Sequence, residues 1–182
     1  MLAFAVYLIG SVAIPPANAG QSAPGPAPAE AGAGACPSLT SEAIQTAIDR
    51  IALSRVKAAS DAAVHGVEGG PGYPSAARDN VVYLDLAHDK MVTLLDWLHS
   101  ADLLDPPGYV SNATGAYNVH GYVRESVTDL HYARHWATVS AVAHTSADAR
   151  SSYELTTQAL DLLETLGAQA GRCYMDGYGP FN

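Results

Sequence analysis

The amino-acid sequence predicts an all-α fold, an antiparallel four-helix bundle that follows a disordered N-terminal segment rich in Pro and Ala. Beyond that segment, apolar residues recur at three- and four-residue spacing, and alternating strand patterns are missing. Four such stretches with moderate connections favour an up-down bundle, in which both chain ends emerge at the same end. The two cysteines, Cys36 and Cys173, flank the four stretches, which is the geometry that a bridge between them requires.

The first two helices are predicted from an apolar stripe and from the residues that end it. The first helix is expected over about 41–65, and Gly66 follows it as a typical C-terminal residue. The second is expected over about 80–104, before the Asp-Pro-Pro sequence at 105–107. Pro ends a helix there because it lacks a backbone N–H and clashes with the preceding turn.

The last two helices are predicted in the same way. The third is expected over about 121–144. The fourth begins at a capping-box pattern that starts at Ser151, or at an earlier one that starts at Thr145, and it ends at Gly167. Leucines on the apolar stripes of the second, third and fourth helices are expected in the core, namely Leu94, Leu130 and Leu162.

The start of the chain is interpreted as a leader and a tether. Residues 1–19 resemble a signal peptide, because an apolar run is followed by the small-x-small sequence Ala17-Asn18-Ala19. No Lys or Arg precedes Arg50, so either the true start lies upstream or the leader interpretation is wrong. Residues 20–37 are predicted to be a flexible linker and residues 38–182 a single helical-bundle domain. The apolar run is too short to span a bilayer, so no membrane span is expected in the mature chain.

The cysteines add a prediction about location. A disulfide between Cys36 and Cys173 would form only in an oxidising compartment, so the protein is expected to be periplasmic or secreted. Closing so long a loop would stabilise the fold by roughly 4 to 5 kcal/mol in the chain-entropy model. The alternative is two free thiols, which exposure outside the cytoplasm disfavours.

Charge and motifs exclude several classes of function. The net charge of −9 and the sequence pI near 5 argue against nucleic-acid binding, which requires a Lys/Arg surface. The sequence has no Gly-x-Ser-x-Gly motif, no phosphate-binding loop and no dinucleotide-binding glycine pattern, so catalysis is the minority interpretation.

Histidines suggest a metal site as an alternative function. Asp85 and His88 lie three residues apart on one flank of the second helix, and His131 and His135 lie four apart on the corresponding flank of the third. If those flanks face each other, the four side chains converge and would suit Zn, Cu or Fe. Ordinary boundary histidines are the competing interpretation. Asp96 and His99 form a second Asp-x-x-His pair, which would either chelate a metal or form a simple hydrogen bond.

Two arginines fall on apolar stripes. Arg55 and Arg134 lie near the middle of the first and third helices, and a buried guanidinium needs an acceptor. One interpretation is a small-anion pocket, with a carboxylate or phosphate as the acceptor. The other is that the stems pack and the charged heads reach solvent.

Tyrosines in the connections suggest a contact surface. An up-down bundle gathers four of them at the end that carries the cysteines, namely Tyr109, Tyr117, Tyr174 and Tyr178. Tyrosine is common at interfaces, although these rings would also close the open end of the core. The leading functional hypothesis is therefore an exported helical-bundle binding or structural module that acts through its surface on an unknown protein or small-molecule partner.

Overall fold

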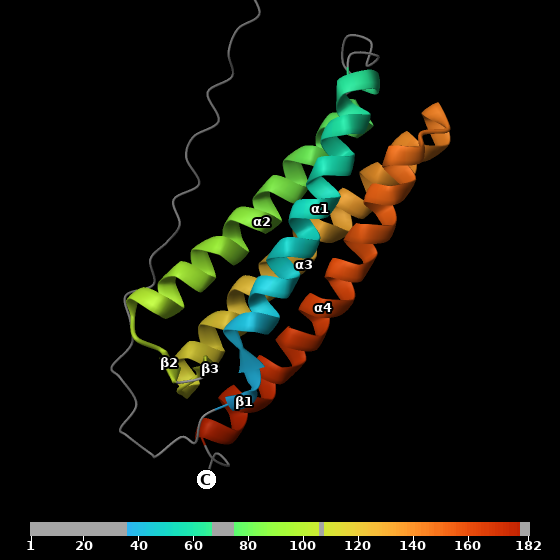
Figure 1. The fold of residues 1–182 in the computed structure, drawn as a ribbon. Helices are drawn as coiled ribbons and strands as arrows, with labels where there is room; N and C mark the ends of the chain where they lie inside the picture. The colour runs from blue at the N-terminus through green and yellow to red at the C-terminus, as the bar shows by residue number, and fades with distance from the viewer. Residues whose placement is uncertain (1–35, 67–74, 106–107, 179–182) are drawn as a thin grey trace, which may run out of the picture.

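Four long helices pack against one another as an antiparallel bundle (Figure 1). The computed structural model describes residues 36–66, 75–105 and 108–178. The helices are α1 (Ser41–His65), α2 (Ala76–Ser100), α3 (Ala113–His144) and α4 (Ala147–Tyr178). Each helix packs on the two that neighbour it in the ring α1, α2, α3, α4. The all-α bundle prediction is confirmed, whereas the predicted leader and nearly all of the predicted linker lie outside the described residues.

Several of the helix boundaries differ from the sequence-based expectations for local reasons. Helix α1 has the predicted bounds, but α2 begins earlier because the side chain of Ser75 accepts a hydrogen bond from the Arg78 N–H and caps it. Asn112 likewise caps α3 eight residues before the predicted start, accepting from the Gly115 N–H at 2.9 Å. Ser146 accepts from the Ala149 N–H at 3.1 Å at the start of α4.

Helix α4 continues beyond Gly167, where the sequence suggested an end. A Cβ atom at Gly167 would lie 3.2 Å from Val123 Cγ1 of α3, and at Gly171 it would lie 3.6 Å from the His120 ring. The His120 ring also lies within hydrogen-bond distance of the Gly167 carbonyl. Glycine therefore serves close packing between α3 and α4 at this position, and the last helix runs to Tyr178.

A small antiparallel sheet, absent from the sequence-based prediction, closes one end of the bundle. Strand β1 (Cys36–Thr40) pairs with β3 (Tyr109–Val110), which pairs with β2 (Leu104–Asp105). Strands of two residues are too short to show an alternating pattern in the sequence. The predicted second helix extended into what is strand β2.

The disulfide pairing predicted from the sequence is confirmed in the same region. Cys36 in β1 and Cys173 near the end of α4 are bonded, with Cα atoms 5.9 Å apart. The β1 strand and the C-terminal part of α4 lie side by side at this end (Figure 1). The bond joins two elements that are 137 residues apart in the sequence, and this end is called the disulfide end below.

The size and polarity of the core side chains differ between the two ends of the bundle. Near the disulfide end it consists mainly of large aliphatic side chains, including Ile44, Ile48, Ile51, Met91, Leu94, Leu98, Val119, Val123, Leu163 and Leu166. Towards the far end it holds small and polar side chains, including Ser54, Ala58, Asp61, Ala77, Asn80, Ala133, Ala137, Ser140, Ser152 and Thr156. Ser54 Oγ bonds Thr156 Oγ1 at 2.8 Å and Asn80 Nδ2 donates to Ser152 Oγ at 3.0 Å, so the polar layers are connected by hydrogen bonds.

The predicted core leucines are confirmed for two helices and corrected for the third. Leu94 and Leu130 are fully buried, whereas Leu162 is only partly buried because the adjacent Leu163 takes the core position. Among the described helices, none combines the length and the apolar character needed to cross a membrane.

Candidate functional site

The structure does not bring the four predicted metal ligands together. Asp85 on α2 faces α1, where Arg55 donates to one of its oxygens from both Nε and Nη2 at 2.6 Å. His88 Nδ1 lies 3.3 Å from the carboxylate of its neighbour Asp89. The flank of α2 that carries Asp85 and His88 is therefore the flank next to α1, and it is not directed at α3.

The two histidines of α3 are exposed, and each contacts a neighbouring residue of the same helix. Arg134 Nη2 donates to His131 Nδ1 at 3.4 Å, and the ring of His135 lies edge-on to that of Trp136. Between α2 and α3 the opposite flanks meet, as the 2.7 Å contact of Lys90 with Asp129 shows. The predicted convergence required the other hand of the bundle, in which the Asp85 flank would face α3.

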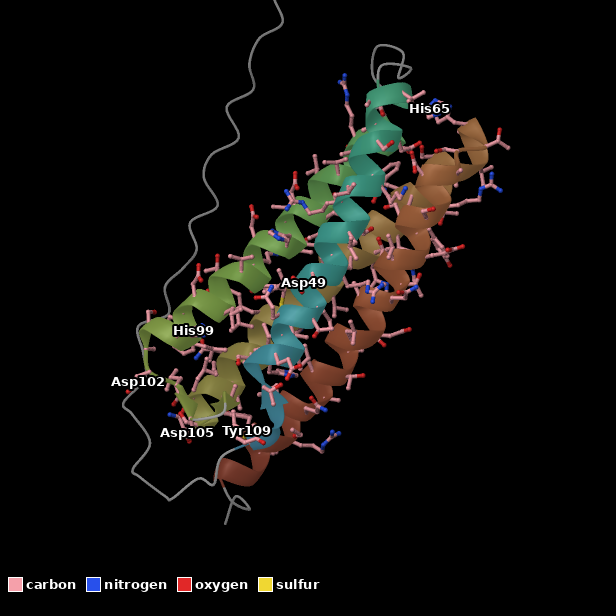
Figure 2. The ribbon with its side chains drawn as sticks, viewed as in Figure 1. Asp49, His65, His99, Asp102, Asp105 and Tyr109 are labelled. Atoms are coloured by element: carbon pink, nitrogen blue, oxygen red, sulfur yellow. A yellow bond between two sulfur atoms is a disulfide. The ribbon has the colours of Figure 1, made fainter. Side chains whose placement is uncertain are left out.

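The remaining predicted ligands and anion-binding residues also have other roles. In residues 36–66, 75–105 and 108–178, no group of three or more His, Cys, Asp or Glu side chains is placed to hold a metal ion. Asp96 is exposed, and His99, at the end of α2 in Figure 2, hydrogen-bonds the Leu95 carbonyl at 2.8 Å. Arg55 obtains its acceptor from Asp85 within the chain, and Arg134 lies on the flank of the core with its head next to His131. Neither arginine therefore points to an anion inside the core.

The predicted tyrosine surface is present in part. The rings of Tyr117 and Tyr174 pack against each other with centroids 5.2 Å apart, and Tyr109 lies at the same end of the bundle (Figure 2). Tyr117 is exposed, whereas Tyr109 and Tyr174 are half-buried. The side chain of Tyr178 lies outside the described residues. Two of the rings thus cover each other, which favours the end-closing role over a broad contact surface.

A larger apolar surface, missed by the sequence analysis, lies along the contact between α2 and α3. It comprises six side chains and is called the α2–α3 surface below: Val82, Tyr83, Leu86, Tyr132, Trp136 and Val139. The rings of Tyr83 and Tyr132 stack across the two helices with centroids 5.0 Å apart. Four of the six side chains are between 37% and 51% exposed, and the two others are half-buried rings.

Helical spacing makes these six residues neighbours. Val82 and Leu86 are four residues apart on α2, and Tyr132, Trp136 and Val139 follow one another at four- and three-residue spacing on α3. The stacked tyrosines then join the two rows. The result is an apolar strip made of two rows of side chains, one on each helix, which meet where the two tyrosine rings stack.

Charged groups border this surface. Towards the disulfide end, Lys90 lies 2.7 Å from Asp129 and 3.7 Å from Glu125. On the other side of Tyr83, one turn earlier on α2, burial raises the pKa of the Asp79 carboxyl group. By helical spacing, Arg78 also lies one turn before Val82 and Asp89 one turn after Leu86. Four acids and two bases therefore border the apolar strip, which gives its edge a net negative charge.

One periodic signal in the sequence marks part of this surface. Tyr83, Lys90 and Trp97 recur at seven-residue spacing, each directly before a core residue of α2. This places all three on one flank of the core stripe. The signal does not say which neighbouring helix that flank meets, so the α3 half of the surface is visible only in the structure.

Comparison of the chain with protein-family models, with curated proteins and with solved structures finds no match. No family is therefore assigned, and no ligand or activity is transferred from a relative. The functional argument depends on the geometry of the described residues.

Proposed function

We propose that this protein is an exported helical-bundle binding module that acts through the α2–α3 surface. The observation that carries the proposal is the cluster of exposed apolar side chains around the stacked Tyr83 and Tyr132 rings. Contiguous exposed apolar surface with a polar edge is typical of protein interaction sites. Tyrosine and tryptophan are enriched at the centres of such sites because they bury large areas and keep a polar group at the edge.

The shape and charge of the surface favour one kind of partner. Two antiparallel helices present a straight strip, which suits an amphipathic helix that lays its apolar stripe along it. The edge of the strip carries more acids than bases: two bases, Arg78 and Lys90, stand beside four acids, namely Asp79, Asp89, Glu125 and Asp129. A partner helix with basic residues beside its apolar stripe would therefore be electrostatically complementary.

The export component of the proposal is supported by the disulfide pair. Cys36 and Cys173 are bonded, and no free cysteine is present among the described residues. Disulfides of this structural kind persist in oxidising compartments. Periplasmic or secreted location is thus part of the proposed function, and the mass of the protein recovered from the extracytoplasmic fraction, before and after reduction, tests it.

Site-specific crosslinking tests the contact surface directly. A photoreactive phenylalanine analogue would replace Val82 or Val139 in the full chain, and irradiation of the producing cells would capture whatever lies on the surface. Val56 on α1 is the matched control, because it is also an exposed valine but lies on another face, with 66% exposure. We expect one partner adduct of reproducible mass from positions 82 and 139 and none from position 56.

A charge substitution provides the complementary test. Leu86→Glu places a carboxylate on the apolar strip and should abolish the adduct formed at position 82, because a buried unpaired charge is costly at an interface. Leu53→Glu is the control, since Leu53 on α1 is a comparably exposed leucine, at 53% against 45% for Leu86. Adducts that consist of two copies of this chain, or equal adducts from position 56, would contradict the proposed partner helix.

A further inference from the structure

A pocket of about 390 Å³ lies at the turn between α3 and α4, and it shares no residue with the α2–α3 surface. The pocket is open to solvent, because all of its lining residues except Ala141 are exposed. Apolar and polar side chains line it together, namely Thr138, Ala141, Val142, Thr145, Arg150 and Tyr153. The pocket thus combines an apolar wall, an aromatic ring and one positive charge.

The guanidinium of Arg150 is held in place at this pocket. Its Nε donates to the Ser146 carbonyl at 3.3 Å, and its Nη2 donates to the Thr145 carbonyl at 3.0 Å. These bonds use two of the five N–H groups that an arginine carries. The others have no acceptor within the described residues, so a positioned cation faces the site with donors to spare.

The charge of Arg150 is unpaired among the described residues. In the described part of the chain, no carboxylate lies within ion-pair distance of Arg150. The closest acid before it in the sequence, Asp148, is directed at α1, where it accepts from Lys57 at 3.1 Å and from Ser60 at 2.6 Å. Glu154, one turn after Arg150, is exposed and makes no ion pair with it.

A second arginine lies near the pocket in the sequence but does not line it. Arg134 lies one turn before Thr138 on α3, and its guanidinium donates to His131 and makes no ion pair among the described residues. The chain as a whole has a net charge of −9, and Arg150 is one of its cations without an ion pair among the described residues. A fixed cation in such a setting attracts small anions to the pocket.

We propose that this pocket binds a small organic carboxylate with an apolar or aromatic body. The carboxylate would pair with Arg150, whose planar guanidinium matches two carboxylate oxygens. The body would contact Ala141 and Val142 and pack against the Tyr153 ring. This site shares no residue with the α2–α3 surface, although its Val142 lies one turn from Val139 of that surface on α3.

Benzoate is the probe that tests the proposal. It would be titrated into the full, disulfide-bonded chain while amide resonances are followed by NMR, beside benzamide, which lacks the charge, and acetate, which lacks the ring. We expect saturable benzoate shifts confined to residues around 138–153, with benzamide and acetate each weaker by about tenfold or more. Binding of benzamide as tight as that of benzoate would overturn the role of Arg150.

Two substitutions with matched controls locate the site. Arg150→Gln should weaken benzoate binding by about tenfold or more. Arg124 is an exposed arginine of α3 outside the pocket, so Arg124→Gln should leave benzoate binding unchanged. Because Arg150 also holds the α3–α4 turn, Val142→Asp is a second variant that leaves those hydrogen bonds in place. Val142 is 78% exposed, so the melting temperature should stay constant while the added carboxylate repels benzoate. Unchanged affinity in either Arg150→Gln or Val142→Asp, or the absence of saturable benzoate shifts in the wild type, would overturn the proposed site.

Discussion

Replacing Ser140 with Ala should destabilise the far half of the bundle through the buried carboxyl group of Asp61. Asp61 is 1% exposed, and its Oδ2 accepts a hydrogen bond from Ser140 Oγ at 2.6 Å. Its other oxygen, Oδ1, has no hydrogen-bond partner among the described residues. Ser140→Ala therefore removes the one hydrogen bond that the described structure gives this carboxyl group.

The magnitude follows from the cost of leaving a buried polar group without a partner. That cost is about 1 to 3 kcal/mol, and the higher helix propensity of Ala returns only about 0.5 kcal/mol. Ser140→Ala should thus lower the free energy of unfolding by roughly 1 to 2.5 kcal/mol. In an Asp61→Ala background the same substitution removes a hydroxyl that has already lost its acceptor, so it should be neutral or slightly stabilising. Ser140→Ala is therefore expected to destabilise the wild type but not the Asp61→Ala variant.

Urea unfolding of four proteins measures this coupling. The free energies of the wild type, both single variants and the double variant are obtained by linear extrapolation, with the disulfide intact. Ser126→Ala is the control, because Ser126 is a buried serine of α3 whose hydroxyl has no partner within the described residues. Its removal should not destabilise. Equal costs of Ser140→Ala in both backgrounds, or a comparable cost for Ser126→Ala, would refute the reasoning.

Three further outcomes are expected. Cys36→Ser removes the disulfide, which closes a loop across 137 residues, and should lower the free energy of unfolding by roughly 5 kcal/mol. A loss below about 2 kcal/mol in urea unfolding would show that the bond is not a main constraint on the unfolded chain. Leu130→Ala should cost about 2 to 5 kcal/mol, and Leu162→Ala less than about 2 kcal/mol because Leu162 is only partly buried; the reverse order in thermal unfolding would contradict the core assignment. The hydroxyl of Ser60 and a neighbouring lysine lower the pKa of Asp148 from 3.8, so its contribution to stability is present above that pH and is lost as the pH falls through the lowered value. Ser60→Ala should move that pKa back towards 3.8 in a carbon-detected NMR titration, and an unmoved pKa would exclude the hydrogen bond as the cause.

Much of the fold follows from short-range features of the sequence. The three- and four-residue spacing of apolar side chains identifies four helices, because each helix must bury one face. The bounds of α1 follow from its apolar stripe and the glycine at its end. The disulfide pairing follows from having two cysteines that flank an up-down arrangement.

Other features required several helices to be placed together. Glycine often ends a helix, yet Gly167 lies inside α4 because a side chain there would crowd Val123 of α3, and that contact depends on the neighbouring helix. The small sheet likewise depends on strands of two residues being brought beside β1 by the bundle end.

The candidate sites show most clearly which features a single helix sets and which require the packed helices. Periodicity determined that Asp85 lies on one flank of α2 and Tyr83 on the other, because a helix has a fixed number of residues per turn. It did not determine which flank meets α3, since both hands of an antiparallel bundle bury the same core stripes. Only the tertiary structure decided this, by placing Asp85 against Arg55 of α1 and Tyr83 against Tyr132 of α3. The hand of a bundle depends on the packing of all four helices at once, and no single helix encodes it in its own pattern.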